Sequence, residues 1–290
     1  MNKSLTIVFN SFFSEKHLNR VLKNLKKYRV IIIENSQDIV LKLKLEKKYK
    51  NVNVIIPNKN LGLAKGYNVG IKNAKTKYVF LNNPDLEISN KSIDQLLSYA
   101  KKIKKFGIIA PVYDDEKVYK NYGSDPTNRE KELEYLKKNK IKSVNWIDNN
   151  FFINKNQIKK SLFDEKYFLY FETLDFCLNL KRKKKQLLVS KKIKIKHYGS
   201  KSTDDKYKDV VELTRAWHYN WSKFYYYRKN FNYVYAVRKI TPNLIQAIKK
   251  IIINMFKLNK HDVYVSIVEI YGILSSMLCL RSFYRPSIKS

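Results

Sequence analysis

The stretch from Asn60 to Asp85 combines residue types that can bind a phosphorylated ligand. Gly62, Gly66 and Gly70 recur every four residues in a segment with helical character, and Asp85 follows a hydrophobic run. Backbone N–H groups at a glycine-containing turn into a helix can bind a diphosphate. A carboxylate just beyond a strand can hold a divalent cation over the same phosphates. Together these features predict a site for a diphosphate and a cation.

The glycine spacing separates this site from two common phosphate motifs. Intervals of four match neither the GxGxxG dinucleotide fingerprint nor the GxxxxGK sequence of a P-loop. A helix whose small residues pack on a sheet would also explain the three glycines. It would not explain Asn60, Asn68 or the Asn-Pro-Asp sequence at residues 83–85.

A second group of acidic residues lies in the aromatic stretch from Phe163 to Leu180. Glu172 and Asp175 are three residues apart, so they would share one face of a helix that opens at about Tyr170. A carboxylate there could remove the proton of an attacking hydroxyl group. The alternative is that both acids stabilise the helix N-terminus, which is worth roughly 0.3 to 1 kcal/mol for each.

His197 follows a segment, Leu187 to Lys196, that alternates like a pair of strands. A histidine at such a strand end can bind a cation, but a lone histidine is more often structural. The residue types alone leave both interpretations open.

The elements that would position these residues alternate along the first half of the chain. In an α/β fold with a Rossmann-like, mostly parallel central sheet flanked by helices, ligands bind beyond the carboxyl ends of the strands. Those ends fall near Asn10, Glu34, residues 57–60 and residues 82–85. The expected strands are Leu5–Phe9, Val30–Ile33, Val52–Ile56, Lys77–Leu81 and Val144–Ile147. The expected helices are His17–Lys27, Ile39–Tyr49, one after Gly62, Ser92–Lys105 and Glu130–Lys138. Gly107 is expected to end the helix Ser92–Lys105.

Three segments carry a resemblance to a known family. They are Ile33 to Ser36, the sequence Asn60 to Gly70, and the Asn-Pro-Asp sequence that ends at Asp85. This pattern resembles the family 2 inverting glycosyltransferases with a GT-A nucleotide-diphospho-sugar transferase fold, particularly the rhamnosyltransferase-like branch. The resemblance spans about Leu5 to Ser202.

The resemblance implies transfer of a hexosyl or deoxyhexosyl group from a nucleoside-diphosphate-sugar donor. The acceptor would be a glycan or a lipid-linked glycan, as in cell-surface polysaccharide synthesis. A Mg or Mn cation would neutralise charge on the leaving nucleoside diphosphate. The implied donor-binding residues are Asn10, Glu34, Asn60, Gly62, Lys65, Gly66, Asn68 and Asn83. The implied metal ligands are Asp85 and His197. The implied catalytic residues are Glu172, which would take the proton, and Asp175, which would orient the site.

Thr173 departs from the family pattern, which commonly has two adjacent acidic residues at this point. A threonine hydroxyl cannot act as a general base at neutral pH. The alternative to an active transferase is therefore a catalytically inactive glycan-binding or scaffold protein of the same fold.

The end of the chain is expected to be helical. Residues 1–203 would form the GT-A domain and residues 204–290 a helical C-terminal region. The expected helices are Asp204–Asn230, Asn243–Leu258 and Asp262–Leu280. The basic, amphipathic character of the second favours a peripheral position on an anionic membrane surface, while the alternative is that these helices simply pack on the catalytic domain. A span is disfavoured by Glu269, near the centre of the third segment.

The composition bounds the remaining possibilities. The chain has 290 residues and a formal net charge of +34, yet only nine of its 59 basic residues are arginines. Recognition of phosphates on nucleic acid usually uses the planar arginine fork, so we expect no nucleic-acid partner. The alternative, nucleic-acid binding by the Lys-rich surface, predicts salt-sensitive binding without donor specificity. Two distant cysteines indicate neither a disulfide framework nor a zinc site. No signal peptide is indicated, so the sequence predicts a cytoplasmic protein, with the cytoplasmic membrane face as its possible peripheral site.

Overall fold

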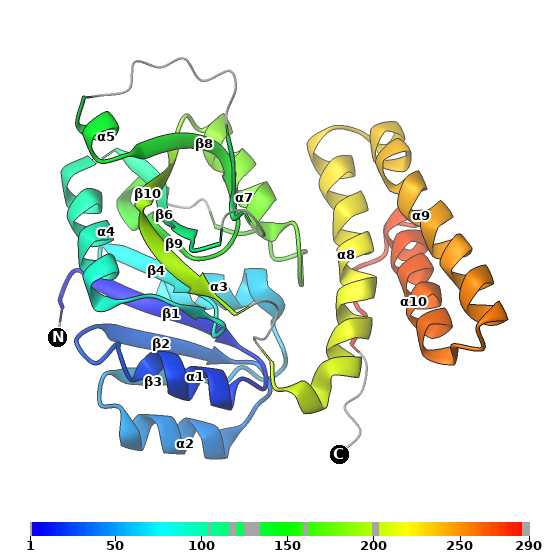
Figure 1. Cartoon of the computed structure of the whole chain (residues 1–290), viewed down its shortest axis with the longest axis horizontal. Helices are drawn as coiled ribbons and strands as arrows, with labels where there is room; N and C mark the ends of the chain where they lie inside the picture. The colour runs from blue at the N-terminus through cyan, green and yellow to red at the C-terminus, as the bar shows by residue number, and fades with distance from the viewer. Residues whose placement is uncertain are drawn as a thin grey trace. The chain divides into compact units, whose positions relative to one another are not determined.

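A computed structural model describes residues 2–103, 105–115, 120–124, 134–158, 162–198 and 203–285. It divides into two compact units (Figure 1). The sheet unit comprises Met1–Leu61, Lys65–Phe163 and Thr173–Asp204. The helical unit comprises Gly62–Ala64, Asp164–Glu172 and Asp205–Ser290.

The sheet unit is organised around one large mixed sheet. Its strand order is β3-β2-β1-β4-β9-β6-β10-β8-β7, with β5 also paired to β10. The strands are β1 (Leu5–Ser11), β2 (Arg29–Glu34), β3 (Val52–Ile55), β4 (Tyr78–Asn82), β5 (Leu86–Glu87), β6 (Phe106–Tyr113), β7 (Tyr122–Ser124), β8 (Ile141–Ile147), β9 (Phe151–Asn154) and β10 (Gln186–His197).

The first four long strands form the parallel part of the sheet that the sequence predicts. β1 pairs in parallel with both β2 and β4, and β2 pairs in parallel with β3. Beyond β4 the sheet is mixed, because β9 runs antiparallel between β4 and β6. The expected α/β architecture is thus confirmed, but "mostly parallel" describes only its first half.

Helices cover both faces of this sheet. Leu5, Ile7 and Phe9 of β1 share a buried cluster with side chains of α1, α2 and α4, whereas Val8, on the opposite face, lies against α3. This period of two is what a strand buried on both faces requires. The helices of the sheet unit are α1 (Glu15–Leu22), α2 (Ile39–Lys48), α3 (Gly62–Asn73), α4 (Asn90–Ile103), α5 (Glu134–Lys138), α6 (Lys155–Ile158) and α7 (Glu172–Arg182), of which α3 and α7 begin in the helical unit.

Several expected boundaries were wrong. Gly107 lies inside β6 rather than ending a helix, and α4 ends at Ile103. The segment expected as a pair of strands is the single strand β10, whose pairing with β6 is interrupted by register shifts between Ser190 and Lys194. A bulge changes the side-chain alternation without a turn. Of the helix expected from Glu130, residues 130–133 lie outside the described residues.

The helical unit contains η1 (Asp205–Tyr207), α8 (Lys208–Asn230), α9 (Tyr233–Phe256) and α10 (Lys260–Met277). Phe224 of α8, Ala236 and Ile240 of α9, and Ile273 of α10 form its shared core. α9 begins ten residues before the expected Asn243 because Pro242 lies inside the helix. None of the described helices is both long and apolar enough to cross a membrane.

Candidate active site

The carboxyl ends of β1 and β2 are joined by a buried carboxylate. Glu34 has no solvent exposure, and its Oε2 accepts a hydrogen bond of 2.6 Å from the Ser11 hydroxyl. Its Oε1 accepts one of 2.8 Å from the backbone N–H of Ser36 and another from the Ser36 hydroxyl. The carboxylate therefore fixes the loop after β2. Its expected role in binding the nucleotide stays a prediction. A nucleotide would compete with Ser11 and Ser36 for the carboxylate oxygens.

Asn10 directly precedes Ser11 on β1. The Asn35 amide donates to Asn10 Oδ1, while Asn35 Oδ1 accepts a 2.9 Å hydrogen bond from the backbone N–H of Leu61. Asn35 thus links the end of β1 to the chain that enters α3. Asn60, which precedes Leu61, is half-buried at this entry.

Two glycines allow α3 to lie very close to β1. A Cβ atom at Gly66 would lie 2.7 Å from the carboxamide of Asn10, and one at Gly70 would lie 2.3 Å from Val8 Cγ1. Contacts that short are not tolerated between non-bonded atoms. Close packing of α3 on the sheet therefore explains the four-residue spacing of these two glycines. This is the alternative to phosphate binding that the sequence left open. Lys65, also on α3, is half-buried.

Asn68 connects α3 to the segment before the acidic motif. Its Nδ2 donates to the carbonyl of Phe163 at 2.9 Å, and its Oδ1 accepts from the N–H of Phe163 at 3.0 Å. The pair resembles a two-point strand contact and fixes the carboxamide against the Phe163 backbone. The expected role of Asn68 in donor binding stays a prediction. On the preceding residue of α3, the Tyr67 hydroxyl donates to Asn83 Oδ1 at 2.6 Å, which fixes the Asn-Pro-Asp turn.

Gly62 has a different reason to be a glycine. Its φ of +72° lies in the left-handed region, and a Cβ atom there would lie 2.3 Å from the carbonyl oxygen of Phe168. The same oxygen accepts a 2.7 Å hydrogen bond from the N–H of Leu63. The N–H of Leu63, in the first turn of α3, is thus already hydrogen-bonded to a carbonyl of the same unit.

The two candidate metal ligands are brought together by a short strand pair. β5 pairs antiparallel with β10, with Leu86 opposite His197. The N–H of Tyr198 then donates to the carbonyl of Asp85 at 3.1 Å. This pairing places the carboxylate that follows β4 beside a histidine far away in the sequence. His197 stacks on Tyr113, with ring centroids 4.6 Å apart, which orients the imidazole.

The geometry of this pair fits a divalent cation. Asp85 Oδ2 lies 3.7 Å from His197 Nε2, and neighbouring ligand atoms of one cation lie about 3 to 3.5 Å apart for bonds of about 2.1 Å. Asp85 Oδ1 is buried and, within the described residues, accepts no hydrogen bond. A small side-chain rotation would let both residues contact one ion.

The acidic motif opens α7. Glu172 is the first residue of this helix, not Tyr170, because Tyr170 and Phe171 have φ values of +68° and +63°. Two consecutive aromatic residues in the left-handed region are a strained conformation of the kind that gathers at functional sites. Within the helical unit, Phe171 packs against Tyr219 and Tyr226 of α8. Glu172 and Asp175 are both buried.

Asp148 is a carboxylate that the sequence analysis missed. It directly follows β8, and its Oδ1 accepts a 3.3 Å hydrogen bond from the Thr173 hydroxyl. Burial raises the pKa of Asp148, while the hydrogen bond from Thr173 and, to a smaller extent, the electrostatic interaction with His197 act in the opposite direction. The signal was present in the sequence: an acidic residue immediately after a predicted strand, the same pattern that singled out Asp85.

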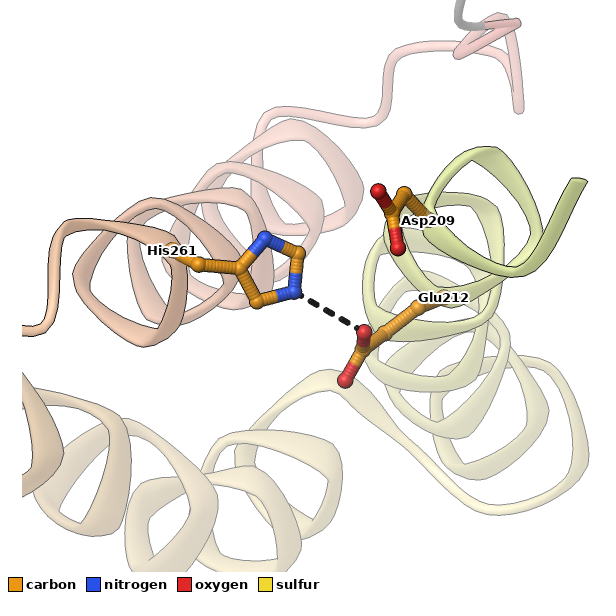
Figure 2. A group of neighbouring side chains, drawn as sticks. All are labelled: Asp209, Glu212 and His261. Carbon is orange, nitrogen blue, oxygen red and sulfur yellow. Dashed lines mark hydrogen bonds and ion pairs between the residues drawn. The ribbon is translucent and has the colours of Figure 1, made fainter. Parts of the chain in front are cut away.

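A separate group of potential metal ligands lies in the helical unit (Figure 2). Asp209 and Glu212 of α8 face His261 of α10, and His261 Nε2 lies 3.0 Å from Glu212 Oε2. All three side chains are exposed. The hydrogen bond to Glu212 raises the pKa of His261. We interpret the group as a surface ion pair between the starts of two helices.

Comparison with known proteins agrees with this architecture. The mannosyltransferase PcManGT from Pyrobaculum calidifontis, solved with GDP-Man and Mn2+, is similar with a TM-score of 0.57 and 8% identity, over 96% of this chain and 88% of that one. GalNAc-T7, solved with UDP, GalNAc and Mn2+, is similar with a TM-score of 0.56 and 16% identity, over 84% of this chain but only 57% of that one. At these identities the likeness shows the GT-A fold alone.

The sequence comparison is more specific. No curated protein matches the chain. The sequence model of glycosyl transferase family 2, however, matches residues 5–165. That range covers more than half of the chain and includes the strand ends, α3 and Asp85. The chain therefore belongs to glycosyl transferase family 2.

Proposed function

We propose that this glycosyltransferase moves a hexosyl or deoxyhexosyl group, with inversion, from a nucleoside-diphosphate-sugar donor to a glycan or lipid-linked acceptor. The observation that carries the proposal is the Asp85–His197 pair beside the carboxyl ends of β1, β2 and β4. The similar structures contain nucleotide or nucleotide-sugar and Mn2+, which supports the same ligand class. The rhamnosyltransferase-like resemblance favours a deoxyhexose.

In the proposed site the donor lies along the strand ends. Glu34 and Asn10 would bind the nucleoside, with Asn35 and Ser36 holding their loops. Residues 60–68 and Asn83 would lie along the diphosphate. Asp85 and His197 would hold a Mg or Mn ion, which stabilises charge on the leaving diphosphate. The oxygen and nitrogen donor set favours Mn over Mg, which prefers oxygen ligands alone.

The transfer is a single displacement. Glu172 removes the proton of the acceptor hydroxyl as that oxygen forms a bond to the anomeric carbon. The bond from this carbon to the diphosphate oxygen breaks, and the nucleoside diphosphate leaves with the electron pair. Asp175, one turn further along α7, orients the acceptor. The product is the glycosylated acceptor with inverted anomeric configuration.

Asp148 is a second candidate for proton removal. It contacts Thr173, the residue that stands where the family commonly has an acid. The carboxylate of Asp148, directly after β8, would then take the place of the acid that the family commonly has at the position of Thr173 on α7. This contact also supports an active enzyme over the alternative, an inactive glycan-binding or scaffold protein, which would show no donor turnover at all.

Four variants distinguish these roles: Glu172→Gln, Asp175→Asn, Asp148→Asn and, as a control, Glu165→Gln at an exposed position before α7. We expect Glu172→Gln to lower kcat for transfer by about 10²- to 10⁴-fold, the usual contribution of a general base, with the donor KM little changed. Glu165→Gln should retain full activity. Full activity in Glu172→Gln would eliminate that assignment, and a selective kcat loss in Asp148→Asn would transfer the role to Asp148.

The proposal places the protein in the cytoplasm, where nucleotide sugars are available, and assigns donor binding and chemistry to residues 1–203. Residues 204–290 are proposed to form a separate helical region. Fractionation of cells into soluble and membrane material, at low and high salt, tests this placement.

A further inference from the structure

α9 carries apolar side chains on both its inner and outer faces. Ala236, Ile240 and Ala247 are buried on the inner face, where the first two share a core with α8 and α10. The outer face is exposed and also carries large apolar side chains. It consists of Ile245, Ile248, Ile252, Ile253, Met255 and Phe256, with exposed fractions from 45% to 87%.

The spacing of these residues forms one continuous stripe. Ile245, Ile248, Ile252 and Met255 follow one another at intervals of three, four and three, which places them on one side of a helix. The stripe ends at the α9–α10 turn, where Phe256 and Leu258 are 87% and 85% exposed. A soluble helix normally has polar residues on its outer side, so a stripe of this size indicates a surface that is covered in use.

The charged residues of α9 and of the turn after it all have one sign. Residues 233–260 contain no Asp or Glu. Lys250 pairs with Glu269 of α10 at 3.1 Å. The basic residues of this segment are Arg238, Lys239, Lys249, Lys250, Lys257 and Lys260.

A hollow on the same helix combines both kinds of side chain. It has a volume of about 520 Å³ and is lined by Arg238, Thr241, Pro242, Ile245, Gln246 and Lys249. Two cations with an amide and a hydroxyl between them match a phosphate-bearing headgroup, and Ile245 continues the apolar stripe at its edge.

We propose that the outer face of α9 and the α9–α10 turn bind the surface of an anionic lipid bilayer. The apolar stripe would enter the boundary between headgroups and acyl chains, about 5 to 10 Å deep. The lysines and Arg238 would contact the anionic headgroups, each contributing about fivefold to the partition coefficient. Since no described helix can span a membrane, the segment lies in the membrane plane.

The charges argue against a second copy of this chain as the occupant. A twofold interface brings the same patch of both copies together, so it would place two all-basic segments against each other without an acidic partner in residues 233–260. An anionic membrane instead supplies the complementary charge and the apolar phase.

This inference goes beyond the proposed function, because lipid binding can be measured without donor or acceptor. The full chain is sedimented with phosphatidylcholine vesicles, with or without about 30 mol% phosphatidylglycerol, at low and high salt. We expect binding to the anionic vesicles that is at least tenfold stronger than binding to the neutral ones and weakens as salt rises.

Two variants test the surface itself. Ile248→Ser/Ile252→Ser/Phe256→Ser removes apolar contacts, and Lys249→Gln/Lys257→Gln removes two charges. We expect each to weaken binding by at least tenfold while the helical circular dichroism is retained. The matched control is Ile39→Ser/Val40→Ser/Leu43→Ser on α2, which also carries three exposed apolar residues, and it should bind like the unmodified chain.

Three results would overturn the proposal. One is equal binding to neutral and anionic vesicles, and another is loss of binding in the α2 control but not in the α9 variants. The third is a lipid-free dimer that the Ile248→Ser/Ile252→Ser/Phe256→Ser variant dissociates, which would make the stripe a protein interface. Donor turnover of these variants in detergent-free buffer, with a soluble acceptor, reports separately on the proposed function.

Discussion

Gly66 and Gly70 have no room for a side chain, and this space restriction alone is enough to explain why both are glycines. Both pack α3 against β1, with Asn10 and Val8 as their neighbours. The sequence alone could not separate this from diphosphate binding, because both need small residues at helical spacing. Packing does not exclude binding: it brings Gly66 of α3 close to Asn10, where the donor is proposed to lie.

We expect Gly66→Ala to displace the Asn10 carboxamide and to destabilise the protein by about 1 to 3 kcal/mol, the usual cost of overpacking. Urea unfolding measures this cost, and donor affinity should fall with it. Lys72→Ala, at an exposed position of the same helix, is the matched control and should change neither. Unchanged stability and affinity in Gly66→Ala would show that Asn10 can move freely.

Side-chain partners limited what could be predicted for individual residues. The Asp85–His197 pair was expected from the resemblance, and the structure brings the two side chains within 3.7 Å. The contacts of Asn68 with the Phe163 backbone were not foreseeable, since nothing in the sequence indicates which backbone crosses α3. Asp148 was missed although it directly follows an expected strand, because its link to the acidic motif is a contact with Thr173 that only the folded chain shows.

At the scale of elements, strands buried on both faces were easiest to predict. β1 to β4 are apolar runs between helical segments, and each lies within two residues of its expected bounds. β10 was harder, because its bulge breaks the alternation that a continuous strand would show. α9 was misplaced because proline usually ends a helix, whereas Pro242 lies on its exposed side.

α8 gives the protein a predictable response to acid through His218. This side chain is fully buried, with Nε2 2.9 Å from the carbonyl of Tyr284 and 3.0 Å from Arg285 Nη1. Burial, and secondarily the charge of Arg285, lowers the pKa of His218 from 6.5 to about 3. Between these values the unfolded chain binds one more proton than the folded one. Stability is therefore lost as the pH falls, by up to about 1.4 kcal/mol per pH unit.

Chemical unfolding between pH 7 and 4 measures this slope, and His218→Gln should make it shallower. His261→Gln is the control with the opposite sign. Because its hydrogen bond to Glu212 raises the pKa of His261, its small contribution is present at low pH and is lost as the pH rises. An identical slope in the unmodified chain and in His218→Gln would contradict the role given to His218.

At the scale of the whole molecule, we propose that the two units have different tasks. The family match ends at residue 165, before α7, His197 and all of α8 to α10. The sheet unit contains most of the residues proposed to bind the donor, and the helical unit contains the basic, apolar surface of α9. The whole chain has a net charge of +34. In residues 233–260 the basic residues accompany a stripe of exposed apolar residues, so in this segment we propose that the positive charge serves lipid binding.

The central claim is that a nucleotide sugar binds beside Asp85 and His197 with a divalent cation. It is tested most directly by thermal unfolding of the unmodified chain and of Asp85→Asn with a panel of nucleoside diphosphates and their sugars, with and without Mn2+. Asp94→Asn, a change at a surface ion pair with Lys27, is the control. A ligand at about 100 times its Kd adds about 2.7 kcal/mol to stability. We predict that one nucleotide and its sugar raise the Tm by several degrees only with Mn2+, in the unmodified chain and in Asp94→Asn but not in Asp85→Asn. A panel without any stabilising ligand, or a shift that survives Asp85→Asn and metal removal, would contradict it.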